Sequence, residues 1–161
     1  MRILVLNGGT GTIKAALASV VRGTVTIERR ATVPLDDAAG PAAAFDAILA
    51  ALADGLDGIH GIGHRVVHGG LALTEPAIVD AAVEAEIARL VPLAPLHNPV
   101  ALTGIATARR RWPTLPMVAV FDTAFHARRS DASRRYALPT DLVQRHDLYR
   151  YGFHGLSLIH I

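Results

Sequence analysis

A glycine-rich turn placed directly after the first apolar run limits the folds open to this chain more than any other feature. Residues 2–7 (RILVLN) are apolar and run into glycines, which predicts a strand buried on both faces. The turn GGTG follows at residues 8–11, and two continuations compete from Thr12 onward. A second strand would make an antiparallel hairpin. A helix through residues 13–17 would instead make a strand–turn–helix unit.

The same turn has the chemistry of a phosphate-binding loop. Glycines let backbone N–H groups approach an anion closely, and Thr10 and Thr12 add hydroxyl donors. Lys14, the only lysine in the chain, adds a mobile positive charge. The turn is no Walker A loop, because Gly-Lys-Ser/Thr does not follow four spacer residues. It is similar to the turn of Rossmann-type reductases and nucleotide-sugar epimerases, but Lys14 stands where their third glycine packs the helix. A hairpin turn without a ligand is a further interpretation.

Alternating strand and helix patterns predict one α/β domain. We expect strands at residues 24–33, 59–67 and 117–121, and helices at residues 41–56, 79–90, 98–111 and 139–146. Asn98 is expected to cap its helix, with Pro99 at the first helical position, after a proline-rich loop at residues 92–99. The pattern at residues 155–161 is typical of the start of another element, which predicts that the domain continues beyond this chain.

Composition excludes several classes of protein. Of the 161 residues 51% are hydrophobic and 19% charged, which excludes a disordered chain, and the absence of cysteine excludes disulfides and thiolate sites. The net charge is +2 and the only run of three cations is at residues 109–111, so no nucleic-acid partner is expected. Neither a signal peptide nor a membrane span is predicted, and a cytoplasmic location fits. The mean hydropathy of +0.33 indicates an apolar surface that would normally be covered.

Three further segments carry candidate site residues. Arg65 lies near the end of a predicted strand, where a buried guanidinium needs a carboxylate or an anionic ligand. Asp122 directly follows another strand, at the edge where open α/β sheets bind ligands, although a helix cap would use the same residue. His154 stands between glycines in a loop and is either functional or a plain turn residue. A metal site formed by His64 and His68 is a weaker alternative.

Together these segments resemble the acetate kinase family, which has propionate and butyrate kinases as relatives. The first motif of that family is Asn, any residue, Gly, Ser, two Ser/Thr, any residue, Lys, and it corresponds to residues 7–14. The second motif, His-Arg-Val-Val-His-Gly, is unchanged at residues 64–69. Segments similar to further family blocks follow in the family's order at residues 93–99 (LAPLHNP), 120–126 (VFDTAFH) and 150–155 (RYGFHG).

The resemblance implies a ribonuclease-H-like α/β domain of the actin/Hsp70/sugar-kinase superfamily, with a mixed sheet, N-terminal antiparallel strands and flanking helices. It implies reversible phosphoryl transfer from ATP to acetate or a similar short-chain carboxylate, giving acetyl phosphate and ADP, with Mg²⁺. It also implies a homodimer for the full-length form. The implied roles are catalysis by Asp122, His154 and Arg65, acyl binding by Arg65, Val67, Leu96 and Phe153, phosphate or nucleotide binding by Thr10, Thr12 and Lys14, and a place beside the magnesium for Asn7.

The chain also departs from the family pattern. Gly11 stands where the family has a hydroxyl residue, and Leu156 and Leu158 replace Thr and His after the His-Gly pair. The family is longer, and its C-terminal domain carries most of the adenosine pocket. We therefore expect residues 1–161 to be the N-terminal acyl- and phosphate-binding domain of an acetate kinase, inactive alone, with the nucleotide-binding domain absent from this chain. The alternatives are a Rossmann-type NAD(P)-dependent reductase or epimerase and a non-catalytic, anion-binding paralogue.

Overall fold

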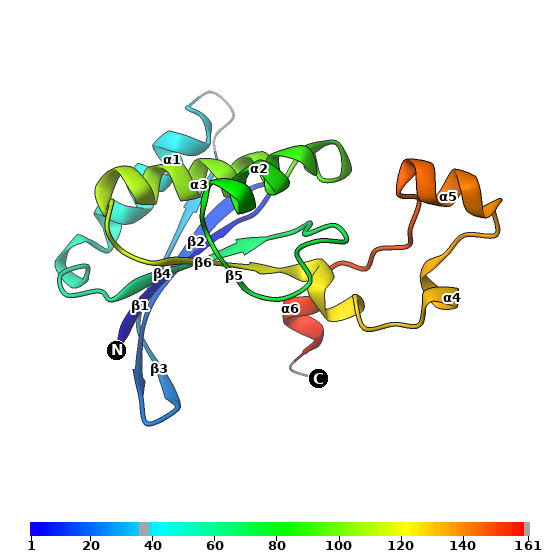
Figure 1. Ribbon diagram of the computed structural model, residues 1–161. Coiled ribbons are helices and arrows are strands. Elements are labelled where there is room, and N and C mark those ends of the chain that lie inside the picture. The colour runs from blue at the N-terminus through cyan, green and yellow to red at the C-terminus, as the bar shows by residue number, and fades with distance from the viewer. Residues whose placement is uncertain (36–38, 160–161) are drawn as a thin grey trace.

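Three antiparallel strands open the fold and continue into a parallel section. The computed structural model describes residues 1–35 and 39–159. The strands are β1 (Arg2–Gly8), β2 (Thr12–Val21), β3 (Thr24–Pro34), β4 (Gly61–Val66), β5 (Ala77–Ile78) and β6 (Met117–Phe121). They form one sheet in the order β3-β2-β1-β4-β6-β5 (Figure 1). β1, β4 and β6 run parallel, whereas β2, β3 and β5 are antiparallel to their neighbours. This mixed sheet confirms the expected fold class.

The chain continues from the glycine-rich turn as a strand. β2 pairs with β1 from Arg2 opposite Ser19 to Gly8 opposite Ile13. Alternate β2 residues, including Ile13, are buried against the core, and Lys14 is exposed on the other face, as the period of two in a strand requires. The predicted hairpin is therefore confirmed. The helix over residues 13–17 that the Rossmann alternative needs is not formed, which removes the structural basis for that alternative.

Helices cover one face of this sheet. The α-helices are α1 (Gly40–Ala51), α2 (Ala81–Arg89), α3 (Asn98–Arg111), α4 (Asp131–Arg134), α5 (Thr140–His146) and α6 (Gly155–Leu158). Short 3-10 helices are η1 (Ala53–Gly55), η2 (Val91–Leu93) and η3 (Asp122–His126). Figure 1 shows α1, α2 and α3 on one side of the sheet, and α4 and α5 on an excursion away from it.

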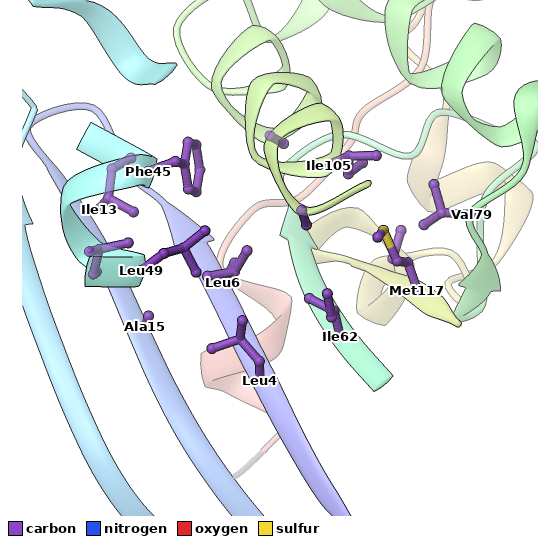
Figure 2. Packing of buried hydrophobic residues seen from close by; sticks show 14 of the residues in the cluster. Leu4, Leu6, Ile13, Ala15, Phe45, Leu49, Ile62, Val79, Ile105 and Met117 are labelled. Carbon is purple, nitrogen blue, oxygen red and sulfur yellow. The ribbon is translucent and has the colours of Figure 1, made fainter. Parts of the chain in front are cut away.

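The main core lies between the sheet and helices α1 and α3. Figure 2 shows Leu4 and Leu6 of β1 facing Phe45 and Leu49 of α1, with Ile105 of α3 over the parallel strands. Gly104 of α3 lies so close to α1 that an added Cβ would come within 2.5 Å of the Phe45 ring. A residue without a side chain is thus needed where the two helices cross. This contact fixes α3, and with it the loop that precedes α3.

The structure corrects one local prediction and refines others. Asn98 is the first residue of α3 rather than its cap, and its side chain makes no capping hydrogen bond. Its amide instead bonds to the backbone of His68 and Ile87, because the start of α3 is buried beside β4 and α2. The helix predicted at residues 41–56 ends at Ala51 and is followed by η1, and the loop predicted at residues 92–99 contains part of η2.

The last predicted element begins where expected. Residues 155–158 form α6, whereas residues 160–161 of the predicted stretch lie outside the described residues. Within residues 1–35 and 39–159, no helix is both long and apolar enough to cross a lipid bilayer.

Candidate active site

The carboxyl ends of the parallel strands bring three predicted site residues together. Asn7 of β1 is the register partner of Arg65 of β4, and Asp122 directly follows β6. Arg65 donates from Nε to Asp122 Oδ1 at 3.0 Å and from Nη1 to Asn7 Oδ1 at 3.0 Å. Its Nη2 donates to Asp122 Oδ2, which makes the pair bidentate. The predicted anionic partner of Arg65 is therefore a side-chain carboxylate.

Burial makes this network a defined electrostatic feature. The Asp122 side chain is 1% exposed, whereas the Arg65 side chain is 22% exposed. A guanidinium has five N–H donors, and three of those in Arg65 are used by Asp122 and Asn7. In the part of the chain that the structure describes, the other two N–H groups of Arg65 have no acceptor, so they are available to an anion. Asp122 is not a helix cap, because it is the first residue of η3, the cap position is Phe121, and no side chain makes a capping hydrogen bond there.

An apolar cavity of about 350 Å³ opens beside Arg65. It is lined by Arg65, Val67, Leu93, Ala94, Pro95, Leu96, His97, Asp122, Phe153 and His154. Six of these residues were singled out from the sequence, and they come from four separate segments of the chain. The cavity therefore combines one cation, one carboxylate and two histidines with hydrocarbon walls. This chemistry suits a small ligand that has a charged head and an apolar tail.

The loop that carries Phe153 and His154 is held by close backbone contacts. His154 has a φ of 57°, in the left-handed region, and the ring nitrogen Nε2 of His126 lies 3.0 Å from the Phe153 carbonyl oxygen. A Cβ at Gly155 would overlap the carbonyl oxygen of Asp122. Glycine at position 155 thus lets this loop approach the residue that pairs with Arg65. The loop location of His154 agrees with the sequence prediction.

The phosphate-turn residues lie beside this cavity and do not line it. Thr10 borders a neighbouring depression, and Pro95 and Leu96 line both hollows. Lys14 is the register partner of Asn7 and is exposed, and Thr12 is half-buried. The Gly9 N–H donates to the Thr12 carbonyl oxygen, which closes the turn. The structure thus places the turn next to the Arg65 network without bringing all its side chains into one pocket.

Sequence reasoning missed His97 as a cavity residue. Burial, and secondarily the nearby positive charge of Arg65, lowers the pKa of this imidazole, so its neutral form is favoured. His97 follows Leu96 in the proline-rich segment, and a polar ring next to a predicted pocket residue was a usable signal. It gives the cavity a second imidazole beside that of His154.

The alternative metal site at His64 and His68 is not supported. No group of three His, Asp or Glu side chains placed to hold a metal occurs in the part of the chain that the structure describes. His68 Nδ1 accepts a hydrogen bond from the Gly70 N–H, so this nitrogen is already engaged. His64 is buried in the core, and burial lowers its pKa to about 4. Both histidines belong to the packed interior.

A hairpin-led mixed sheet with polar groups at its parallel strand ends defines a ribonuclease-H-like domain of the kind found in the actin, Hsp70 and sugar-kinase superfamily. The chain belongs to the Acetokinase family, whose model matches residues 22–161.

Similar proteins show how much of a relative this chain represents. It is 43% identical to an acetate kinase of Streptomyces griseus, over 97% of this chain and 44% of that relative. It is 46% identical to an acetate kinase of Deinococcus deserti, over 93% of this chain and 36% of that relative. Its fold matches the crystal structure of Porphyromonas gingivalis acetate kinase with a TM-score of 0.79 and 30% identity, covering 98% of this chain and 46% of the other. A propionate kinase from Francisella tularensis matches with a TM-score of 0.79 and 33% identity, at the same coverage. The chain thus spans less than half the length of these relatives.

Proposed function

We propose that this chain is the acyl- and phosphate-binding part of an acetate kinase. The observation that carries the proposal is the guanidinium of Arg65 at the mouth of a small apolar cavity. A carboxylate is planar and accepts two parallel hydrogen bonds, which the remaining Arg65 donors can supply. Val67, Leu96 and Phe153 give the acyl methyl group an apolar environment. The cavity of about 350 Å³ has room for acetate and for somewhat longer short-chain acids.

Phosphoryl transfer to a carboxylate needs positioning and charge neutralisation more than a strong base. An acetate oxygen is already a nucleophile, so the residues need only align it with the phosphoryl group and stabilise the charge that develops. Arg65 binds the carboxylate of the substrate. Asp122 fixes the position of the Arg65 guanidinium through two hydrogen bonds, and its negative charge helps to orient the reacting groups. His154 lines the same cavity, and in this proposal it donates a hydrogen bond to an equatorial phosphoryl oxygen. The catalytic residues of this proposal are therefore Arg65, Asp122 and His154.

ATP would lie on the side of the glycine-rich turn. Thr10, Thr12 and Lys14 follow the carboxyl end of β1, next to Asn7, and supply hydroxyl and ammonium donors for phosphate oxygens. The oxygens of Asp122 and Asn7 fit Mg²⁺, which binds through one or two carboxylates together with substrate phosphates and water. When bound, the ion would neutralise phosphate charge. Both side chains now accept from Arg65, and this arrangement holds them near each other.

The groups described here form one wall of a cleft. These relatives are more than twice as long as this chain. We propose that their additional length supplies the adenosine pocket and the charges on the opposite side of the cleft. We further propose that the full-length form is a cytoplasmic homodimer. An open half-site leaves its charges in contact with water, where they stabilise a transition state poorly. Residues 1–161 alone are therefore expected to bind small anions without turnover.

A coupled assay for ADP release tests this assignment. The 161-residue chain is incubated with ATP, Mg²⁺ and acetate, in parallel with a hybrid that continues into the remaining length of the Streptomyces griseus relative. We expect background rates from the chain alone and acetate-dependent ADP release from the hybrid. Turnover by the chain alone would contradict the half-site account. A hybrid that folds and binds ATP without acetate-dependent release would favour a non-catalytic, anion-binding paralogue.

A further inference from the structure

A buried polar pair connects the walls of the acyl cavity without lining the cavity itself. The walls come from the residue after β4 (Val67), the loop before α3 (Leu96 and His97) and the loop at residues 153–154. These segments are far apart in sequence. His68 and Asn98 directly follow two of them, and their exposed fractions are 1% and 0%. Neither residue has a role in the proposed reaction.

The Asn98 amide joins the first two walls. Its Oδ1 accepts from the His68 N–H at 3.2 Å, and its Nδ2 donates to the His68 carbonyl oxygen at 3.1 Å. The Asn98 side chain thus satisfies both backbone groups of His68, as the backbone of a neighbouring strand would. Nδ2 also donates to the Ile87 carbonyl oxygen in the last turn of α2, at 3.2 Å. Val67 and His97, the neighbours of this pair, are held at a fixed separation as a result.

The His68 ring joins the third wall. Its Nδ1 accepts from the Gly70 N–H at 3.0 Å, so the neutral ring carries its proton on Nε2. The ring contacts Tyr151 edge-on at a centroid distance of 4.4 Å, and Phe153 at 6.0 Å with the same interplanar angle of 63°. A hydrogen bond on one edge therefore orients a ring whose other atoms support the Phe153 loop. The next residue, Gly69, donates to Thr123 Oγ1, beside Asp122.

We propose that His68 and Asn98 are positioning residues that set the width of the acyl cavity by joining its three walls. The inference rests on the proposed function for the identity of the ligand. The contacts by which His68 and Asn98 connect the three walls do not depend on that function. Histidine meets two demands together, since it accepts from Gly70 and presents a ring to Tyr151 and Phe153. Asparagine at position 68 would meet the first demand only, and phenylalanine the second only. The two interactions of His68, its hydrogen bond with Gly70 and its ring contacts with Tyr151 and Phe153, can thus be removed separately.

The test compares His68→Asn and His68→Phe with the unaltered 161-residue chain. Nuclear Overhauser effects between the Phe153 ring and the methyl groups of Val67 and Leu96 report the cavity width, and ¹⁵N spectra of His68 report its tautomer. An acetate titration gives the dissociation constant. The control His64→Asn makes the same change four residues earlier, in a histidine that does not line the cavity. A loss of stability alone would affect both positions.

We expect the Nε2–H tautomer in the unaltered chain, and weaker cross-cavity effects with about tenfold weaker acetate binding in His68→Asn. His68→Phe should keep the Phe153 contacts but lose protection of the Gly70 amide. His64→Asn should leave cavity contacts and acetate binding unchanged. The proposal is overturned if both His68 variants fold and retain the cross-cavity effects of the unaltered chain. If that chain binds no acetate, the proposed ligand is wrong, while the cross-cavity effects still decide the role of His68.

Discussion

Arg65 and Asp122 form a bidentate ion pair across the ends of two adjacent parallel strands, with the carboxylate fully buried and the guanidinium partly exposed. The pair therefore has an inner side fixed by the protein and an outer side open to a ligand. A buried carboxylate without a cation would be costly, so Arg65 has a structural task in addition to its proposed binding task.

Replacing Arg65 alone should destabilise the fold. In Arg65→Met the buried carboxylate of Asp122 loses its partner, and the free energy of unfolding should fall by about 3 kcal/mol. Urea denaturation at neutral pH measures the change. The double variant Arg65→Met with Asp122→Leu removes both charges and should recover most of the loss. Equal stabilities for the single variant and the unaltered chain would show that the pair is energetically unimportant.

Stability should depend on pH through His64. Burial, and secondarily the charge of Arg109, lowers the pKa of His64 from its usual 6.5 to about 4 in the folded chain. Between these values the unfolded chain binds a proton that the folded chain does not. The His64 contribution to the free energy of unfolding is therefore constant above pH 6.5, decreases by about 3 kcal/mol as the pH falls to 4, and is then constant again.

A His64→Leu variant isolates this contribution from those of the carboxyl groups. Its unfolding free energy, measured by denaturant titration at several pH values, should fall less between pH 6.5 and 4 than that of the unaltered chain. Parallel curves for the two proteins would contradict the account of His64.

The helix crossing over the sheet predicts a sharp difference between two glycines. In Gly104→Ala the new methyl group would lie 2.5 Å from the buried Phe45 ring, so the loss from overpacking should exceed the gain in helix propensity. We expect a net loss of about 1–2 kcal/mol in the free energy of unfolding. Gly11→Ala is the matched control, because no atom lies within 4 Å of its added Cβ. Similar losses in both variants would contradict the packing explanation.

Inorganic phosphate should bind weakly at the glycine-rich turn. Amide shifts during a phosphate titration should be largest at residues 9–14, and Lys14→Ala should weaken binding by about tenfold, because a charged donor is lost. Arg30→Ala removes an exposed cation from the neighbouring strand β3 and serves as the control. Shifts that are equally large in Lys14→Ala would place the anion elsewhere.

Local patterns were sufficient to predict much of the architecture. The β-branched run at residues 24–33 and the apolar runs that became β1, β4 and β6 predicted strands, because their residue preferences and tertiary surroundings agree. The choice between helix and strand after the turn stayed open, since residues 13–17 suit both. Pairing with β1 and β3 decided it, and those contacts are distant in sequence.

The site was predictable where motifs carry the chemistry, and unpredictable where tertiary contacts do. Arg65, Asp122 and His154 could be singled out from strand ends and flanking glycines. The bonds of Asn98 could not, because an Asn-Pro pair before a helix normally indicates a cap. Only the burial of this position between β4 and α2 directs its amide to His68 and Ile87 instead.

The central claim is that Arg65 and the adjoining cavity bind a short-chain carboxylate. An amide- and methyl-detected NMR titration of the 161-residue chain with acetate tests it most directly. Arg65→Lys is the comparison, because lysine keeps the positive charge but cannot make two parallel hydrogen bonds to a carboxylate. We predict saturable shifts centred on Val67, Leu96 and Phe153, and about tenfold weaker binding in Arg65→Lys. Shifts centred elsewhere, or equal affinity in a folded Arg65→Lys variant, would contradict the claim.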